Sequence, residues 1–224
     1  MIFTSDVSEA AKVAELAAKM LLATLSTQEG RAGSDLRRAC EDLKSFAELY
    51  IVRNVIGEKL SECFDLARVT GTTLDEFDRV RETIIAEAVT SLVAVLVKQS
   101  CISFSLQQMS LCVIAIKFKS RADVDNVRQM MNDAFNPAEE VAADEMALDV
   151  YKSTVALHAA VTFHLYETAK PLPQMLQYRF GAPRPTLWQS YRLYSTAARA
   201  DEIREENKVI HPAFAPREGR ALAY

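Results

Sequence analysis

The sequence is poor in the residues that make tight turns, cross-links and catalytic centres. Its 224 residues include only six glycines, seven prolines, four cysteines and three histidines, whereas 50% of the residues are hydrophobic. Few helix breakers beside abundant apolar residues favour helices over sheets, and a chain of this length can bury one sizeable core and a small satellite domain. We therefore expect a mainly α-helical protein.

The few cysteines and histidines do not form the patterns of a reactive centre. Because no CxxC pair is present, we expect reduced, buried thiols at Cys40, Cys63, Cys101 and Cys112. His158 and His164 are six residues apart and point to different faces of a helix, which argues against a shared metal ion. The sequence also lacks a glycine-rich phosphate loop, a GxSxG elbow and an HExxH motif. We expect a protein that is not an enzyme and has no catalytic residue, cofactor or metal.

Signals for a membrane or for export are also lacking. The most apolar region, Ile84–Ile116, is interrupted by Glu87, Lys98 and several amides, so it falls short of about eighteen uninterrupted apolar residues. Met1–Thr4 has no basic region that leads into the apolar core of a signal peptide. We expect no membrane span, and synthesis in the cytoplasm.

Helical periodicity extends over residues 5–170, which we interpret as a helical bundle body. A first helix is expected at residues 6–25. A second helix, capped by Ser34, is expected to bend or break near Gly57 and to end at Gly71.

The rest of the body is expected to hold three long helices. Thr73–Glu76 and Ser120–Asp123 fit the capping box, in which a hydroxyl and a carboxylate three residues apart satisfy free backbone N–H groups. The helix that begins at the first box is expected to break near Ser100–Gln107, and the helix at the second box is expected to stop at Asn136–Pro137. A last helix then covers Glu139–Ala169, with acidic residues in its first turns.

The chain after the body is expected to form a small α+β module. Residues 171–185 form a proline-rich linker that includes the first strand, and residues 174–224 form the module itself. Gln174–Phe180 alternates as a strand does, two short helices follow, and Arg220–Tyr224 can pair with the first strand. This β-α-α-β order resembles a LysM module.

Seven residues of the module are candidates for its core or for an interaction surface. Helical spacing places Trp188, Tyr191 and Tyr194 near one face, and Phe214 is positioned to cover them, so we expect these four aromatic side chains to form the core of the module. The single histidine of the module is expected to fix a turn through a local hydrogen bond. The candidates are Trp188, Tyr191, Tyr194, Asn207, His211, Pro212 and Phe214.

Several segments, in this order, resemble the phage Mu-type DNA circularisation protein family. The segments are Phe118–Arg121, Ala134–Glu140, Leu157–Ala160, Pro171–Pro173, Leu187–Tyr194, Arg199–Ile203, Glu206–Pro216 and Gly219–Leu222. The resemblance spans about residues 117–224 and implies a tail or baseplate component of a contractile-tail phage, located in the virion. Where the family usually continues with a glycine and an acid, this chain has Ser195 and Thr196. A left-handed turn would be strained there, so we expect a rebuilt loop.

The charge distribution bears on possible partners. From Lys170 onward the chain has nine basic and five acidic residues, which leaves 17 basic and 25 acidic residues before that point. A basic module on an acidic body favours docking onto acidic protein neighbours. We expect contacts with other tail or baseplate proteins, such as hub, wedge, tube or tape-measure proteins, and a ring-forming homo-oligomer in the particle.

Two other functions belong to different classes. The name of the family implies a DNA-binding protein that helps to circularise injected phage DNA, but the basic residues are spaced singly among acids, which disfavours binding to DNA phosphates. A LysM-like module can also bind peptidoglycan or another glycan. Such a use commonly comes with a partner catalytic domain, which this sequence lacks.

Overall fold

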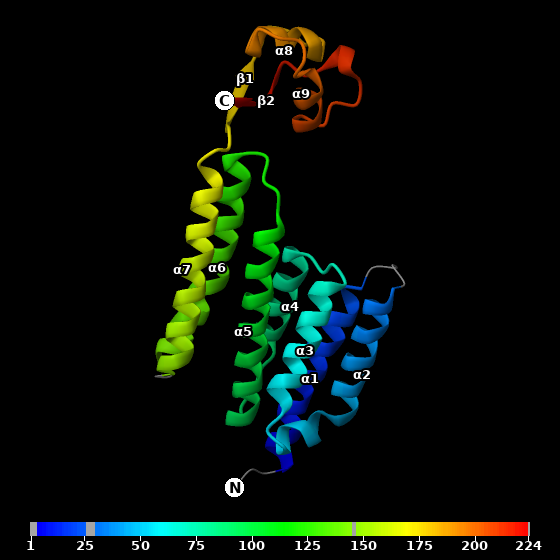
Figure 1. The fold of residues 1–224 in the computed structure, drawn as a ribbon, viewed down its shortest axis with the longest axis vertical. Helices are drawn as coiled ribbons and strands as arrows, with labels where there is room; N and C mark the ends of the chain where they lie inside the picture. The colour runs from blue at the N-terminus through cyan, green and yellow to red at the C-terminus, as the bar shows by residue number, and fades with distance from the viewer. Residues whose placement is uncertain (1–3, 26–29, 145–146, 224) are drawn as a thin grey trace. The chain divides into compact units, whose positions relative to one another are not determined.

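The protein is mainly helical, as its composition predicts. A computed structural model describes residues 4–25, 30–144 and 147–223. The structure is 74% helix, with nine α-helices in the described ranges and a two-stranded antiparallel sheet near the C-terminus (Figure 1). Among these residues, no helix combines the length and the apolar character that crossing a bilayer requires.

Two compact units make up the chain. The helical unit comprises Met1–Ile116 and Met130–Phe163, and the C-terminal unit comprises Lys117–Gln129 and His164–Tyr224. The division passes through two long helices, so each unit contains one part of both. We describe the two units separately.

The first five helices of the helical unit pack together, and four of them contact the first. They are α1 (Thr4–Ala23), α2 (Arg31–Val52), α3 (Ile56–Val69), α4 (Leu74–Ala86) and α5 (Leu92–Ala115), and α1 contacts each of the other four (Figure 1). The inward face of α1 is built from small side chains, and Ala10, Ala14 and Ala17 are fully buried. Small residues let neighbouring helix backbones approach closely, so larger side chains from the partner helices, such as Phe64 and Phe77, fill the core.

The ends of α2 and α3 confirm one prediction and correct another. The chain breaks between Val52 and Ile56, where Asn54 adopts a left-handed conformation (φ 57°), and α3 ends before Gly71 (φ 93°). The expected break near Gly57 is therefore present. Ser34 is not a helix cap, because α2 already begins at Arg31 and Ser34 donates its backbone N–H to the carbonyl of Gly30.

The capping box at Thr73 is confirmed, but the break in the following apolar region lies elsewhere. Thr73 and Glu76 exchange both hydrogen bonds of the box. The helix ends at Ala86, and α5 then runs without interruption through Ser100–Gln107, where we expected the break. Glu87 is the exposed residue that follows α4.

Two long helices, α6 (Arg121–Asp144) and α7 (Leu148–Ala169), follow α5. Ser120 and Asp123 exchange hydrogen bonds, which confirms the second capping box. The prediction that Asn136–Pro137 stops the helix is wrong: α6 continues through Pro137. The acids Glu139 and Glu140 consequently belong to α6, not to the start of the next helix; Glu145 lies outside the described residues.

His158 joins the parts of α6 and α7 that belong to the helical unit. Its Nδ1 lies 2.8 Å from Glu139 Oε1 and its Nε2 lies 2.9 Å from Asn132 Oδ1. The imidazole also stacks on Phe135, with ring centroids 4.8 Å apart. Polar and aromatic contacts thus occupy both ring nitrogens and one ring face of this histidine, which serves packing between the two helices.

The C-terminal unit has the expected order of strand, helix, helix and strand. β1 (Gln174–Arg179) pairs antiparallel with β2 (Glu218–Ala223), and Gln174 is opposite Ala223. Between the strands lie α8 (Thr186–Tyr194), α9 (Ala200–Glu206) and the short 3₁₀ helix η1 (Pro212–Phe214). Tyr224, the last residue of the expected closing strand, lies outside the described residues.

Glu9 fixes the turn between α4 and α5 to α1. Its carboxylate accepts hydrogen bonds from the backbone N–H groups of Thr90 (2.7 Å) and Ser91 (2.8 Å). The Ser91 hydroxyl, followed by these two N–H groups, lowers the pKa of Glu9 from 4.5 to about 2. A carboxyl group with a lowered pKa stabilises the folded state above its ordinary pKa, and this stabilisation is lost as the pH falls towards the folded-state value.

We predict that Glu9→Gln destabilises the protein at pH 7 and that its difference from the wild-type protein shrinks between about pH 4.5 and pH 2, because the wild-type carboxylate becomes protonated there. Urea unfolding midpoints across this range measure the effect. Glu15→Gln is the matched control, since Glu15 lies exposed on α1 and accepts no hydrogen bond from the described residues. A difference between Glu9→Gln and wild type that stays constant down to pH 2 contradicts the prediction.

Candidate functional site

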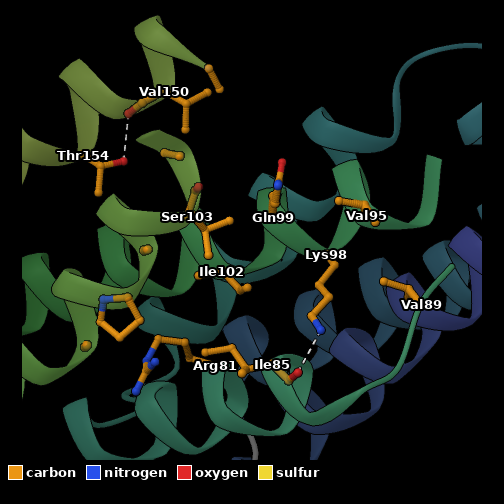
Figure 2. Close-up of a pocket in the computed structure, with 16 residues that line it drawn as sticks. Arg81, Ile85, Val89, Val95, Lys98, Gln99, Ile102, Ser103, Val150 and Thr154 are labelled. Carbon is orange, nitrogen blue, oxygen red and sulfur yellow. Dashed lines mark hydrogen bonds between the residues drawn. The ribbon is translucent and has the colours of Figure 1, made fainter. Parts of the chain in front are cut away.

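A cleft of about 300 Å³ opens in the helical unit between α4 and α5 on one side and α6 and α7 on the other (Figure 2). Its walls are mostly aliphatic; α5 and α6 contribute side chains over about two turns each, and α7 over about one turn. Val95 and Ile102 come from α5, Ala134 and Val141 from α6, and Val150 from α7. Small residues dominate the α6 wall, which leaves room for side chains from another molecule.

The charged groups of the cleft are already engaged. Arg81 is only 7% exposed, and its Nε and Nη2 lie 2.8 Å and 2.7 Å from Asp78 Oδ1. Lys98 donates to the carbonyl of Ile85 in the last turn of α4 (2.8 Å) and to that of Glu87 just after it (2.7 Å), and Figure 2 shows the first of these bonds. Because these cations already have partners within the protein, the cleft presents mainly apolar surface to a binding partner.

Apolar and acidic side chains surround the lining residues on the same helices. Leu92 and Leu96 on α5 and Leu148 on α7 are exposed. Exposed carboxylates lie in the same part of α6 and α7, at Glu140, Asp144 and Asp149. An exposed apolar patch of this kind marks an interaction surface in a soluble protein.

The core of the C-terminal unit consists of other residues than we expected. Tyr178, Ile203 and Ala221 are buried, and Phe180, Leu193 and Tyr194 pack against them. Of the predicted aromatic core, Tyr194 alone takes part. Ile203, which is not among the seven candidates, is fully buried in this core. Its apolar side chain lies between charged residues of α9 and marks the inward face of that short helix.

Tyr194 also joins α8 to α9 and β2. Its hydroxyl donates to Glu202 Oε1 (3.0 Å) and accepts from the backbone N–H of Leu222 (3.1 Å). The guanidinium of Arg199 lies over its ring at 3.7 Å and donates to the same Glu202 carboxylate. Burial and the neighbouring Glu202 raise the pKa of Tyr194 to about 12. The phenol therefore acts as a permanent hydrogen-bond donor within the fold.

Helix α8 turns its polar side chains inward. Thr186, Gln189 and Ser190 are buried. Gln189 accepts from the Tyr178 hydroxyl (2.8 Å) and donates to the carbonyl of Pro216 (2.8 Å). The Ser190 hydroxyl donates to the carbonyl of Thr196 (2.7 Å). Because these bonds satisfy the buried groups, the polar face of α8 can lie inside the unit.

The outward face of α8 consists of large apolar side chains. Leu187 is exposed, Trp188 is 44% exposed and Tyr191 is 67% exposed. The prediction that Trp188 and Tyr191 form the module core is therefore wrong. Trp188 contacts Phe180 edge to face at 5.2 Å, and the guanidinium of Arg184 lies 5.4 Å from its ring.

Phe214, at 78% exposed, does not cover the α8 aromatics, contrary to the prediction. His211 Nδ1 accepts from the N–H of Ala213 (3.3 Å), which confirms its expected role in the turn, and Pro212 begins η1. The remaining candidate, Asn207, has a structural role.

Asn207 ties the end of α9 to β2. Its side chain accepts from the N–H of Arg220 (2.6 Å) and donates to the carbonyls of Arg220 (2.9 Å) and Ile203 (2.8 Å). A Cβ on Gly219 would clash with the Asn207 side-chain oxygen, so a larger residue there requires the Asn207 side chain to shift. The loop after α8 keeps a left-handed residue at Ser195 (φ 59°), where we expected such a turn to be avoided.

We predict that Ile203→Ala unfolds the C-terminal unit locally, whereas Trp188→Ala leaves it folded. Truncating a buried isoleucine costs about 2–5 kcal/mol, while the half-exposed indole removes fewer contacts. Hydrogen exchange is expected to show lost protection over residues 174–223 for Ile203→Ala only. Equal loss of protection in both variants would mean that the indole belongs to the core.

The described part of the chain contains no candidate metal-binding cluster. It holds no group of three or more His, Cys, Asp or Glu side chains that could bind a metal ion. Cys40, Cys63 and Cys101 are free and buried, as predicted, and Cys112 is free but half-buried. A comparison of the chain with protein-family models and with curated proteins finds no match.

Proposed function

We propose that this protein is a structural component of the baseplate or tail hub of a contractile-tail phage or phage-derived particle, and that it acts through protein contacts. The order of motifs over residues 117–224 supports this proposal through its resemblance to the phage family. Its partners are other tail proteins of the hub, wedge, tube or tape-measure type. The strand, helix, helix, strand unit is proposed to be LysM-like.

The inverted arrangement of α8 carries the proposal. A short helix on a small unit ordinarily buries its apolar face, because apolar burial stabilises folding. Here Gln189 and Ser190 are buried and hydrogen-bonded, whereas Trp188 and Tyr191 point outward. Tryptophan and tyrosine are enriched among the residues that dominate protein interfaces. An outward aromatic face supported by an inward polar network is best explained as a docking surface.

We predict that the protein co-purifies with intact tails and that Trp188→Ser combined with Tyr191→Ser abolishes its incorporation while leaving the fold intact. Both side chains are exposed, so their loss removes contact surface and little core packing. Mass spectrometry of gradient-purified tails measures incorporation. Leu176→Ser, which changes another exposed apolar residue of the C-terminal unit, is the matched control. Absence of the wild-type protein from tails contradicts the proposal.

Binding to DNA is less well supported. The C-terminal unit has 13 basic and 8 acidic residues, a net charge of +5. Many of these cations have carboxylate partners, such as Arg179 with Glu218 (3.1 Å) and Arg199 with Glu202 (2.7 Å). Paired, dispersed cations neutralise few phosphates, and phosphate neutralisation provides most of the affinity for duplex DNA.

Glycan binding is a second candidate function, and the exposure of Trp188 beside Arg184 favours it, since an indole can serve as a platform for a sugar ring. We predict that the protein does not sediment with insoluble peptidoglycan. If the wild-type protein does sediment and Trp188→Ser alone abolishes this binding while Tyr191→Ser retains it, the indole is a sugar platform. The glycan function would then replace docking as the explanation of α8.

A further inference from the structure

We propose that the outward face of α8 of one copy docks into the cleft of the helical unit of a second copy. We call this face, formed by Arg184, Leu187, Trp188, Tyr191 and Arg192, the aromatic face. This inference rests on the proposed function, in which the protein works through protein contacts, and it names one of the partners. The two surfaces lie on different units of the same chain.

Charge favours this pairing. The helical unit has 13 basic and 22 acidic residues, a net charge of −9, whereas the C-terminal unit has a net charge of +5. Contact between two helical units or between two C-terminal units would bring like charges together. Contact between one helical unit and the C-terminal unit of another copy brings opposite charges together, which speeds association and fixes orientation.

The same complementarity holds for individual side chains. Arg184 and Arg192 are exposed at the two ends of the aromatic face, and neither has a carboxylate partner among the described residues. Near the cleft, Glu140, Asp144 and Asp149 are exposed and have no ion-pair partner among those residues. Each surface therefore carries unpaired charges of the sign that the other needs.

The apolar parts also match in size and chemistry. The cleft of about 300 Å³ is lined by aliphatic side chains such as Val95, Ile102 and Val150, with the engaged cations Arg81 and Lys98 at one side (Figure 2). Leu187, Trp188 and Tyr191 are the large side chains that α8 presents outward. A buried indole removes about 150–250 Å² of surface from water, and cations near its ring are tolerated or favourable.

Docking between two different surfaces has a geometric consequence. After pairing, one copy keeps a free cleft and the other keeps a free aromatic face, so association continues from head to tail. Such a heterologous contact closes into a ring where the rotation allows it and otherwise forms an open chain. The structure thus gives a physical basis for an oligomer with more than two copies.

Two blocked variants test this arrangement. The face-blocked variant combines Trp188→Ser with Tyr191→Ser. The cleft-blocked variant combines Val141→Lys with Val150→Lys, which places positive charge in the cleft where the two arginines of the aromatic face are proposed to dock. All four residues are exposed, so both variants are expected to fold, and circular dichroism checks this. Leu176→Ser and Ile114→Ser are matched controls, since these exposed residues belong to neither surface.

Sedimentation velocity across a concentration series gives the readout. Wild-type protein and both controls are expected to form species larger than a dimer, and each blocked variant alone is expected to need at least about tenfold higher concentration to associate. An equimolar mixture of the two blocked variants is expected to stop at a one-to-one dimer, because one intact face meets one intact cleft and both remaining surfaces are blocked. Higher salt is expected to weaken the association.

Three results overturn the inference: wild-type protein that stays monomeric at all concentrations, blocked variants that associate as wild type does, or a mixture that yields no dimer. Its failure is distinguishable from failure of the proposed function. Wild-type protein that is monomeric in solution yet present in purified tails refutes self-docking alone. Self-association of a protein that is absent from tails refutes the tail function alone.

Discussion

Close packing around α1 is the constraint on which the helical unit depends. Four helices contact α1, and the buried alanines of its inward face, among them Ala10, Ala14 and Ala17, leave space for the larger side chains of its neighbours. Glu9, on the same helix, holds the turn that leads from α4 into α5 through two backbone N–H groups. One helix thus sets both the core and the path of the chain into its most apolar segment.

The cleft follows from that arrangement. Between Leu92 and Ala115, α5 carries a single charged side chain, Lys98, and has apolar residues on every face. A helix of this kind is expected to be buried all round. Contacts with α1, α3 and α4 cover only part of it, so other apolar residues, including Leu92 and Leu96, remain exposed near the cleft. The apolar surface that the fold does not use is available to a partner.

The two capping boxes and the order of elements at the C-terminus were predictable from the sequence, whereas the helix break that depends on a distant residue was not. The capping boxes at Thr73 and Ser120 involve residues three apart, and the β1 and β2 pairing follows from alternation and turns. The break between α4 and α5 was misplaced because its stabilising partner, Glu9, lies about eighty residues away in the sequence. Proline at position 137 was read as a stop, yet one missing N–H does not end a helix that tertiary packing supports.

The site was harder to predict than the fold for a related reason. Helical spacing placed Trp188, Tyr191 and Tyr194 near one face, yet Trp188 and Tyr191 are exposed whereas Tyr194 packs against the core. Spacing alone does not say which face of a helix is buried. Gln189 determines which face of α8 is buried. Its amide bridges the Tyr178 hydroxyl and the carbonyl of Pro216, two groups that only the folded chain brings together.

Different residues of the C-terminal unit stabilise its fold and form its exposed aromatic face. Ile203, Tyr178 and Tyr194 hold the unit together, while the aromatic face contributes little to its core. Since no buried side-chain nitrogen or oxygen among the described residues lacks a hydrogen bond, the inward polar network does not leave an uncompensated desolvation cost. The aromatic face can therefore change through substitution without loss of the fold, so stability and docking respond to different residues.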